Sequence, residues 1–482
     1  MHKDVQPSLT LLGTALACLL LSSCATADPA FQQTSLTPAS APQNSPETGE
    51  SGTGSAGQQT TTHVATAPAN GSPLTLEQAV HTALAWHPSI DEAVGRINQH
   101  TAEIDVARAG YYPKVRGGID SSYHSSDGGS WQPRLNVSAS QMIYDFGKVS
   151  SSVEARTAGA NVSRTELLLG VDVLIRDTAN AVIEIQRYRA LLNVAQEQLR
   201  GVQTIADLVR QRSDRGASTR SDEVQADARV NAAQSTVLEI GGQLERWENT
   251  LTNLIGRSGP VNVASSVPQW LSNTCAVAEP DWSQSPAVLQ AEAQRAQALA
   301  QLNLSRAQAF PTLSLEAGAG YDFNRGSENS LASDQPDFTV GINLSGSIYD
   351  GGASAAGQEA ADHALVAADA AIRNSRLNVS SALTQAQSQI GSLQQMLASL
   401  TAREGMMQQT RDLYRQQYVE LGTRTLLDLL NAEQELHQAG FDMANATHDL
   451  RRLGVECMFN SGRSRELLAL DGTTIRGMEL RL

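Results

Sequence analysis

The 482-residue chain is acidic and contains few aromatic residues. It has 35 Lys and Arg against 50 Asp and Glu, a formal net charge of −15, and aromatic residues make up 4% of the sequence. The charge argues against a nucleic acid as partner, because phosphate binding needs basic patches. The scarcity of large side chains favours long helices packed side by side over a thick globular core.

The first 24 residues have the pattern of a secretory signal peptide. Lys3 precedes a mostly apolar run, Leu9 to Leu21, that is too short to span a bilayer as a permanent helix. The segment Leu21-Ser22-Ser23-Cys24 resembles a bacterial lipobox, which implies cleavage before Cys24 and acylation of its thiol. Ordinary signal cleavage after Ala25-Thr26-Ala27 is the alternative.

Residues 25–71 are predicted to form a disordered tether. They are mostly Ser, Thr, Gln, Pro, Gly and Ala, with almost no large apolar side chains. Such a segment buries too little apolar surface to offset the entropy lost on folding. Ordered structure is therefore expected after it.

Most of the remaining chain is predicted to be helical. Thr75 and Gln78 have capping-box spacing at the start of a first helix, which is expected to break near Pro88. Apolar residues recur every seven positions across 149–212, and again between Ile372 and Tyr414, which indicates coiled-coil packing. A helix of some 64 residues is roughly 95 Å long, about three times the hydrocarbon thickness of a bilayer.

Two pairs of strands interrupt the helices. Alternating segments at 115–123 and 134–144 flank a Ser-, Asp- and Gly-rich turn at 125–130. A second pair is predicted at 313–319 and 338–348, and aromatic residues concentrate around both pairs. Strands of about ten residues with aromatic ends are typical of membrane β-barrels. Four strands cannot close a barrel, so other chains must complete it.

The chain is an internal duplication. His87-Pro88 recurs 198 residues later as Ser285-Pro286, and Gly216 recurs 206 residues later as Gly422, with an Asp six residues after each glycine. Glycine ends a helix in a left-handed conformation, so both glycines predict a turn between two helices. A period this long indicates two domain-sized halves rather than a solenoid.

Several motifs, taken in order, resemble the TolC-like outer-membrane efflux family. These are LTLEQAVHTAL, ARAGYYPKV, QMIYDFGKV, GASTRSDEVQADA, FPTLSLEAGAGY, IYDGG and GTRTLLDLLNAEQEL, within residues 74–457. The resemblance implies a homotrimeric channel-tunnel, mainly α-helical, with a twelve-stranded barrel in the outer membrane and a helical tunnel through the periplasm. It also implies docking onto a periplasmic adaptor and an inner-membrane ABC or RND-type transporter. The cargo stays open between type I protein secretion, which the turn motif slightly favours, and tripartite drug or metal efflux.

The expected organisation follows from the repeats. The segments are a signal peptide (1–24), a tether (25–71), a first repeat (72–257), a linker (258–284), a second repeat (285–457) and a C-terminal tail (458–482).

The resemblance places a gate at the periplasmic tip, in the turns after the long helices. Carried over by motif, the gate residues are Ser221, Asp222, Tyr418, Arg424, Asp428 and Asn431. An Arg held by carboxylates would fix the helices closed, and rings of acidic charge would select cations. Asn431 stands where the family member most similar in this turn has a second acidic residue, and Tyr418 lies four residues before Gly422 rather than three. The alternative is that these residues only cap solvated helix ends.

Two cysteines outside the signal and the anchor remain, Cys275 and Cys457. The family folds both segments into a belt around the middle of the tunnel, where the oxidising periplasm allows a disulfide, and two free thiols remain an equal alternative. The sequence has no HExxH, paired CxxC, GxSxG or P-loop motif, so it predicts no enzyme, no metal site and no cofactor. A lipid-anchored coiled-coil scaffold would explain the heptads but not the strand pairs.

Overall fold

A computed structural model describes residues 73–124, 130–259, 261–276, 280–323 and 336–480, all within one compact unit. The predicted signal peptide, Cys24, the tether and residues 125–129 of the predicted turn lie outside the described residues.

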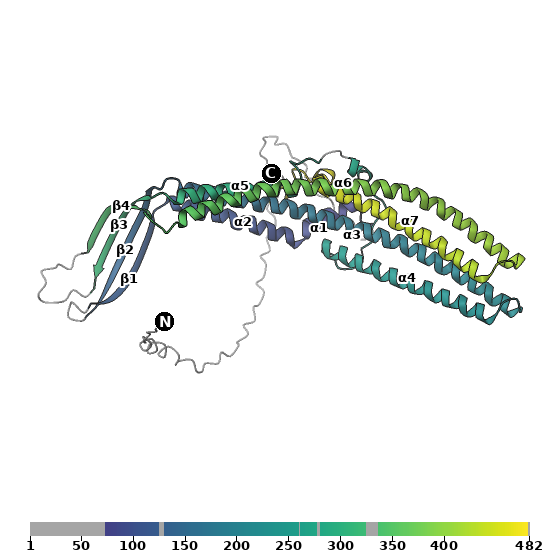
Figure 1. Ribbon diagram of the computed structural model, residues 1–482. Helices are drawn as coiled ribbons and strands as arrows, with labels where there is room; N and C mark the ends of the chain where they lie inside the picture. Colours follow the sequence, from purple (N-terminus) through teal and green to yellow (C-terminus); the bar gives the residue numbers. More distant parts are fainter. Residues whose placement is uncertain (1–72, 125–129, 260, 277–279, 324–335, 481–482) are drawn as a thin grey trace, which may run out of the picture. The chain divides into compact units, whose positions relative to one another are not determined.

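Each half of the chain runs helix, strand pair, long helix, helix (Figure 1). The first half contains α1 (Leu76–Trp86), α2 (Pro88–Arg108), the 3-10 turn η1 (Ala109–Tyr111), β1 (Lys114–His124), β2 (Ser130–Tyr144), α3 (Lys148–Asp214) and α4 (Arg220–Ile255). The second contains η3 (Gln269–Ala276), α5 (Pro286–Gln308), β3 (Thr312–Asp322), β4 (Asp337–Ser345), α6 (Ala353–Gln416), the π-helical turn η4 (Gln417–Leu421) and α7 (Leu426–Asn460). The tail adds α8 (Ser464–Leu467), β5 (Thr474–Ile475) and β6 (Met478–Glu479).

The change from strand to long helix is built identically in both halves. The Asp145 carboxylate accepts hydrogen bonds from the backbone N–H of Gly147 (3.0 Å) and Val149 (2.6 Å). Asp350 accepts from the amides two and four residues later at 3.1 and 2.9 Å. The helix follows a glycine with φ of +89° or +91°, a conformation that favours glycine. The repeated Tyr-Asp-x-Gly motif is therefore a helix-start device.

The four strands form one antiparallel sheet in the order β1-β2-β3-β4. The prediction that the last strand reaches Ile348 is wrong, because β4 ends at Ser345 and Ile348 is fully exposed beyond it. The register explains the early end. Thr312, the first residue of β3, pairs with Ser345, and the preceding Pro311 has no N–H with which to continue the ladder.

Among the described residues, most of the sheet's side chains are not buried by other segments. Every side chain of β4 is exposed, and so is every described side chain of β1. Aromatic residues next to and within the strands are exposed as well: Tyr111, Tyr112, Tyr123, Trp131, Tyr144, Phe146, Phe310, Tyr321, Phe323, Phe338 and Tyr349. Apolar surface of this extent requires a partner or lipid.

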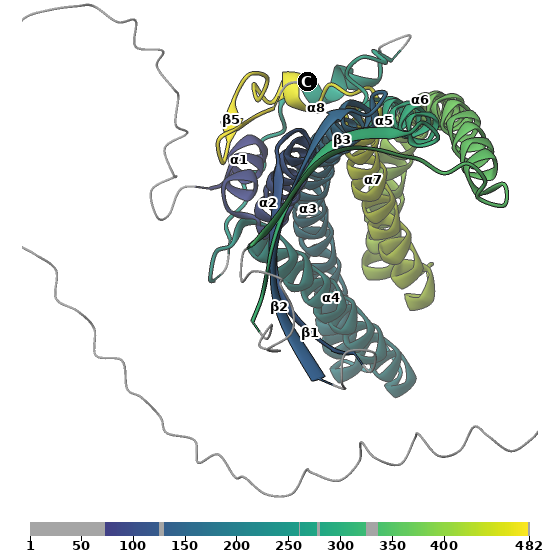
Figure 2. The same cartoon turned by 90° about the vertical axis from the view of Figure 1, so that its left-hand side faces the viewer.

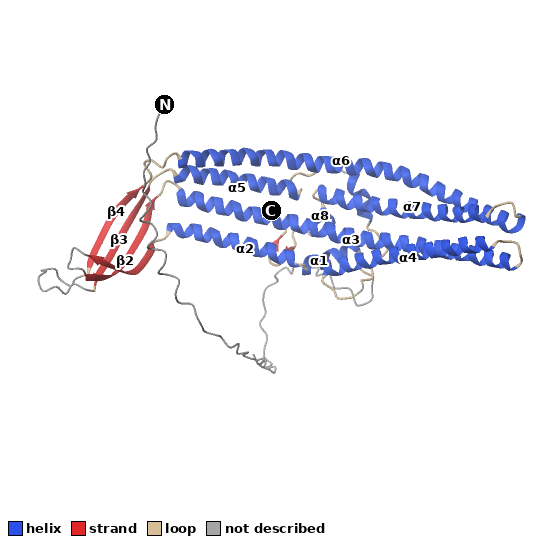
Figure 3. Ribbon diagram, turned by 60° about the horizontal axis from the view of Figure 1, so that its bottom comes forward, coloured by secondary structure: helices blue, strands red, loops and turns tan. Residues whose placement is uncertain are grey.

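The helices pack in sequence order across the two repeats. Helices α2, α3, α5 and α6 lie side by side, while α4 pairs with α3 and α7 pairs with α6 (Figures 2 and 3). Contacts between α3 and α7 join the two hairpins. The heptad prediction is confirmed on α6, where Val379, Ala386 and Leu400 are buried and most of the remaining helix is exposed. None of the helices in the described part of the chain combines the length and apolarity needed to cross a membrane.

Candidate functional site

The turns that close the two long helices share one backbone conformation. Gly216 follows α3 with φ +73°, and Gly422 follows η4 with φ +63°. A Cβ added at either glycine would meet no atom within 4 Å, so the positive φ rather than crowding explains the residue.

The helix that follows each turn begins with a capping box. Thr219 accepts from the Asp222 N–H at 3.1 Å, and the Asp222 carboxylate accepts from the Thr219 N–H at 2.9 Å. Thr425 and Asp428 make the same two hydrogen bonds at 3.2 and 3.3 Å. Within one chain, therefore, both candidate gate aspartates cap helix N-termini, where a negative charge is also favoured by the helix dipole. Ser221 and Asn431 are exposed on the same helices.

Tyr418 connects the two turns. Its side chain is buried, and its Oη lies 3.1 Å from the Ser218 Oγ of the first repeat. The Arg212 guanidinium lies 4.8 Å from the centre of the Tyr418 ring and donates to the Val419 carbonyl oxygen at 3.3 Å. One hydrogen bond, one cation–π contact and one charge-assisted bond thus join the end of α3 to the end of α6.

The extra residue between Tyr418 and the turn is absorbed by the π-helical turn η4. The two residues that follow η4 close it, because the N–H of Gly422 and the N–H of Thr423 both donate to the Gln417 carbonyl oxygen, five and six residues back, the latter at 3.2 Å. A π-turn accommodates one additional residue without ending the helix, and such turns are frequent at functional sites. The unusual Tyr-to-Gly spacing is therefore accommodated by η4, immediately before the turn.

Arg424 is held by neutral groups. Its Nε donates to the Gln417 Oε1 at 3.0 Å, and its guanidinium lies 4.3 Å from the centre of the Tyr414 ring. The hold on this Arg by carboxylates stays a prediction for the assembled channel, and within the chain the Asp428 carboxylate accepts a hydrogen bond from the Thr425 hydroxyl.

Sequence reasoning missed Arg212, Ser218 and the π-turn. The sequence offered one signal, the spacing of four rather than three residues between Tyr418 and Gly422. An additional residue before the turn requires an altered helical turn if the aromatic side chain is to keep its position.

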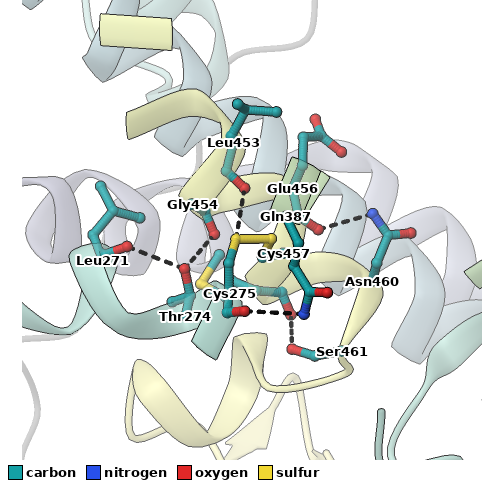
Figure 4. The surroundings of a disulfide bond; sticks show 11 residues. Leu271, Thr274, Cys275, Gln387, Leu453, Gly454, Glu456, Cys457, Asn460 and Ser461 are labelled. Atoms are coloured by element: carbon teal, nitrogen blue, oxygen red, sulfur yellow. Dashed lines mark hydrogen bonds between the residues drawn. A yellow bond between two sulfur atoms is a disulfide. The ribbon is translucent and has the colours of Figure 1, made fainter. Parts of the chain in front are cut away.

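A disulfide fastens the linker to the last long helix. Cys275 of η3 is bonded to Cys457 of α7, with the two Cα atoms 5.2 Å apart (Figure 4). The neighbouring Thr274 hydroxyl donates to the Gly454 carbonyl oxygen at 2.8 Å. A Cβ at Gly454 would lie 2.7 Å from the Leu271 carbonyl oxygen, so only glycine allows this approach of α7 to η3.

A buried charge pair lies beneath the C-terminal tail. The Asp172 carboxylate on α3 is completely buried and lies 3.5 Å from the guanidinium of Arg465, which is 3% exposed. Burial raises the pKa of Asp172 to about 7, although Arg465 acts in the opposite direction. The described residues contain no group of three or more His, Cys, Asp and Glu side chains placed to bind a metal.

Comparison with known proteins gives a consistent result. The outer membrane efflux protein family model matches residues 79–257 and 282–452. Nodulation protein T of Rhizobium leguminosarum is 27% identical, over 34% of each chain. The outer membrane efflux protein BepC of Brucella suis is 21% identical over 78% of this chain and 82% of its own. The alkaline protease secretion protein AprF of Pseudomonas aeruginosa is 25% identical, over 56% of this chain and 57% of its own.

Solved structures show the same fold. A crystal structure of CusC superposes on this chain with a TM-score of 0.67 at 20% identity. The match covers 80% of this chain and 91% of the CusC chain, whose structures were solved to follow folding and transmembrane channel formation. The family is one of outer membrane channels that extend into the periplasm, not of enzymes. Because the family model covers more than half of the chain, in both repeats, the chain belongs to the outer membrane efflux protein family.

Proposed function

We propose that this chain is the outer-membrane exit duct of a trans-envelope export machine and that it works as a homotrimer. The duct receives cargo from an inner-membrane ABC or RND-type transporter through a periplasmic adaptor. Its sheet contacts outer-membrane lipid, and its long helices cross the periplasm.

The uncovered sheet carries this proposal. A four-stranded sheet with exposed apolar side chains such as Val115, Ile119, Val340 and Ile342 has no stable place in water as an isolated unit. Further copies of the chain would pair its edge strands, and lipid would cover its apolar side chains. The sheet is continuous with helices of 67 and 64 residues, long enough to span a wide aqueous compartment. A coiled-coil scaffold without a pore would account for the long helices but not for the uncovered sheet.

The cargo we propose is protein, delivered by type I secretion. The support is the GTRTLLDLLNAEQEL turn and the similarity to AprF, whose name assigns it to alkaline protease secretion. Tripartite drug or metal efflux is the second candidate, because BepC, named an efflux protein, aligns over a larger share of both chains.

The gate of the duct is proposed to be the pair of turns around Tyr418 and Arg424. The contacts of Tyr418 with Ser218 and Arg212 hold the two hairpins together at this end. In a trimer, Asp428 and Asp222 would be repeated around the axis, and like charges at a constriction favour cations and oppose closure.

Cys24 is proposed to carry the lipid anchor. Mass spectrometry of the mature protein tests this, because acylation before Ala25 gives a diacyl or triacyl N-terminal peptide. A mature N-terminus at Asp28 would instead show ordinary signal cleavage.

A comparison of culture-supernatant proteins from a deletion strain, its parent and a complemented strain tests the cargo. Loss of one or a few large proteins, restored by complementation, is expected for type I secretion. An unchanged set of secreted proteins together with raised drug or metal sensitivity would support efflux instead. Planar-bilayer recordings of the purified protein test the duct itself, and a scaffold would give no conductance.

A further inference from the structure

A carboxylate of the second repeat is inserted into a notch in the first repeat. The Glu433 side chain on α7 is only 2% exposed. A Cβ built on Gly201 of α3 would lie 1.7 Å from the Glu433 Oε1, so this carboxylate occupies the space that any larger residue at 201 would take. Glu433 lies about two helical turns from the Thr425 cap and therefore outside the turn network described above.

The inserted carboxylate is paired with two groups of its own hairpin. Its Oε1 lies 3.1 Å from the His437 Nε2, one turn along α7, and its Oε2 lies 3.5 Å from an Arg411 guanidinium nitrogen on α6. One side chain thus contacts three helices, α3, α6 and α7. Removing one partner of a buried charge cluster is costly, because the remaining charge stays without a partner in a low-dielectric site.

Space for a second position of this side chain already exists. Glu433 and Gly201 both line a cavity of about 270 Å³, and both also line a smaller one of about 70 Å³. The larger cavity is bordered by Glu197 and Glu404, and also by Arg411 and His437, the two partners of the inserted carboxylate. A carboxylate displaced from the notch therefore has space beside groups of both charges.

We propose that Glu433 is a positioning residue of the channel, whose carboxylate in the Gly201 notch holds the α6–α7 hairpin against α3 and restrains the helix ends from moving apart. This inference rests on the proposed duct function. The Gly201–Glu433 contact would hold the two hairpins together independently of the contacts that Tyr418 makes with Ser218 and Arg212.

The test uses two variants that break the contact from opposite sides. Gly201→Ala leaves every charge in place and expels the carboxylate by volume, whereas Glu433→Gln keeps the shape and removes the charge. Gly170→Ala is the matched control, because it lies on the same helix and a Cβ there would meet no atom within 4 Å. Alanine is the better helix former at both glycine positions, so helix propensity cannot explain a loss at 201 alone.

Two measurements on the full-length protein separate this inference from the proposed function. Single-channel conductance in planar bilayers is expected to rise at least twofold in Gly201→Ala and Glu433→Gln, to rise no further in the double variant, and to stay unchanged in Gly170→Ala. Spin labels at Val224→Cys and Leu427→Cys, both exposed in the wild type, report the separation of the helix ends directly.

The label distance is expected to lengthen or broaden in Gly201→Ala and to stay at the wild-type value in Gly170→Ala. An unmoved distance in Gly201→Ala, with melting as in the control, would overturn the role of Glu433 while leaving the duct intact. A wild-type protein without conductance would overturn the duct, and the label distances would still decide whether the notch holds the hairpins.

Discussion

The Tyr418 hydroxyl lies 3.1 Å from the Ser218 hydroxyl, and this hydrogen bond joins the closing turns of the two repeats. Tyr418→Phe removes the bond but keeps the ring on which Arg212 lies. A buried hydrogen bond of this kind contributes about 1 kcal/mol. We therefore expect a slightly lower melting temperature and a raised bilayer conductance. Ser218→Ala should give the same result and the double variant no more, whereas additive effects would show that the two hydroxyls act independently.

Arg424 is held at the second turn by Gln417 and the Tyr414 ring. Arg424→Ser removes the hydrogen bond and the cation–π contact, together worth about 1–2 kcal/mol at a partly exposed site. We expect the turn to loosen and the conductance in a planar bilayer to rise. Arg220→Ser is the control, because that exposed side chain forms its ion pair with Glu223 of its own helix. Equal conductance of the two variants would exclude Arg424 from the gate.

The repeat architecture was predictable because it depends on local chemistry. The capping boxes at Thr219 and Thr425 and the left-handed glycines after the long helices follow from residue type and spacing alone. The partners of Arg424 did not follow, because capping already engages the Asp428 carboxylate. The contact of Glu433 with Gly201 could not be predicted either, because the role of a glycine within a helix depends on which side chain of the facing helix lies against it. Contacts between repeats depend on packing, which periodicity does not specify.

The Cys275–Cys457 disulfide closes a segment of 182 residues between the linker and α7. Cross-linking over a long segment limits the unfolded chain, and loss of such a bond typically costs about 2–5 kcal/mol. We expect Cys457→Ser and Cys275→Ser to lower the melting temperature alike, with no further loss in the double variant. Intact mass should rise by about 2 Da on reduction, because two thiols replace one disulfide. An unchanged mass would show two free thiols.

Asp172 and His448 are expected to give the stability opposite dependences on pH. Burial raises the pKa of Asp172 from 3.8 to about 7, so the native state holds a proton that the unfolded chain releases, and stability falls as the pH rises through this window. Burial lowers the pKa of His448 from 6.5 to about 4, with Arg451 and Arg187 acting in the same direction. Its contribution is present above pH 6.5 and is lost as the pH falls toward 4.

Single substitutions should separate these two opposing effects. Between pH 4 and 7, ionisation of Asp172 is expected to lower the free energy of unfolding of the wild type by on the order of 4 kcal/mol. Asp172→Asn removes this decrease, so the melting temperature of the variant should rise with pH relative to that of wild type. Because the His448 imidazole is buried, the wild type loses stability when acid protonates this group in the unfolded chain, and His448→Gln removes this effect. When the pH is lowered from 6.5 to 4, the melting temperature of the variant should therefore fall less than that of wild type. Parallel profiles for Asp172→Asn and wild type between pH 4 and 7 would mean that Asp172 stays ionised beside Arg465 throughout this range. The buried pair would then act as a fixed contact between α3 and the C-terminal tail.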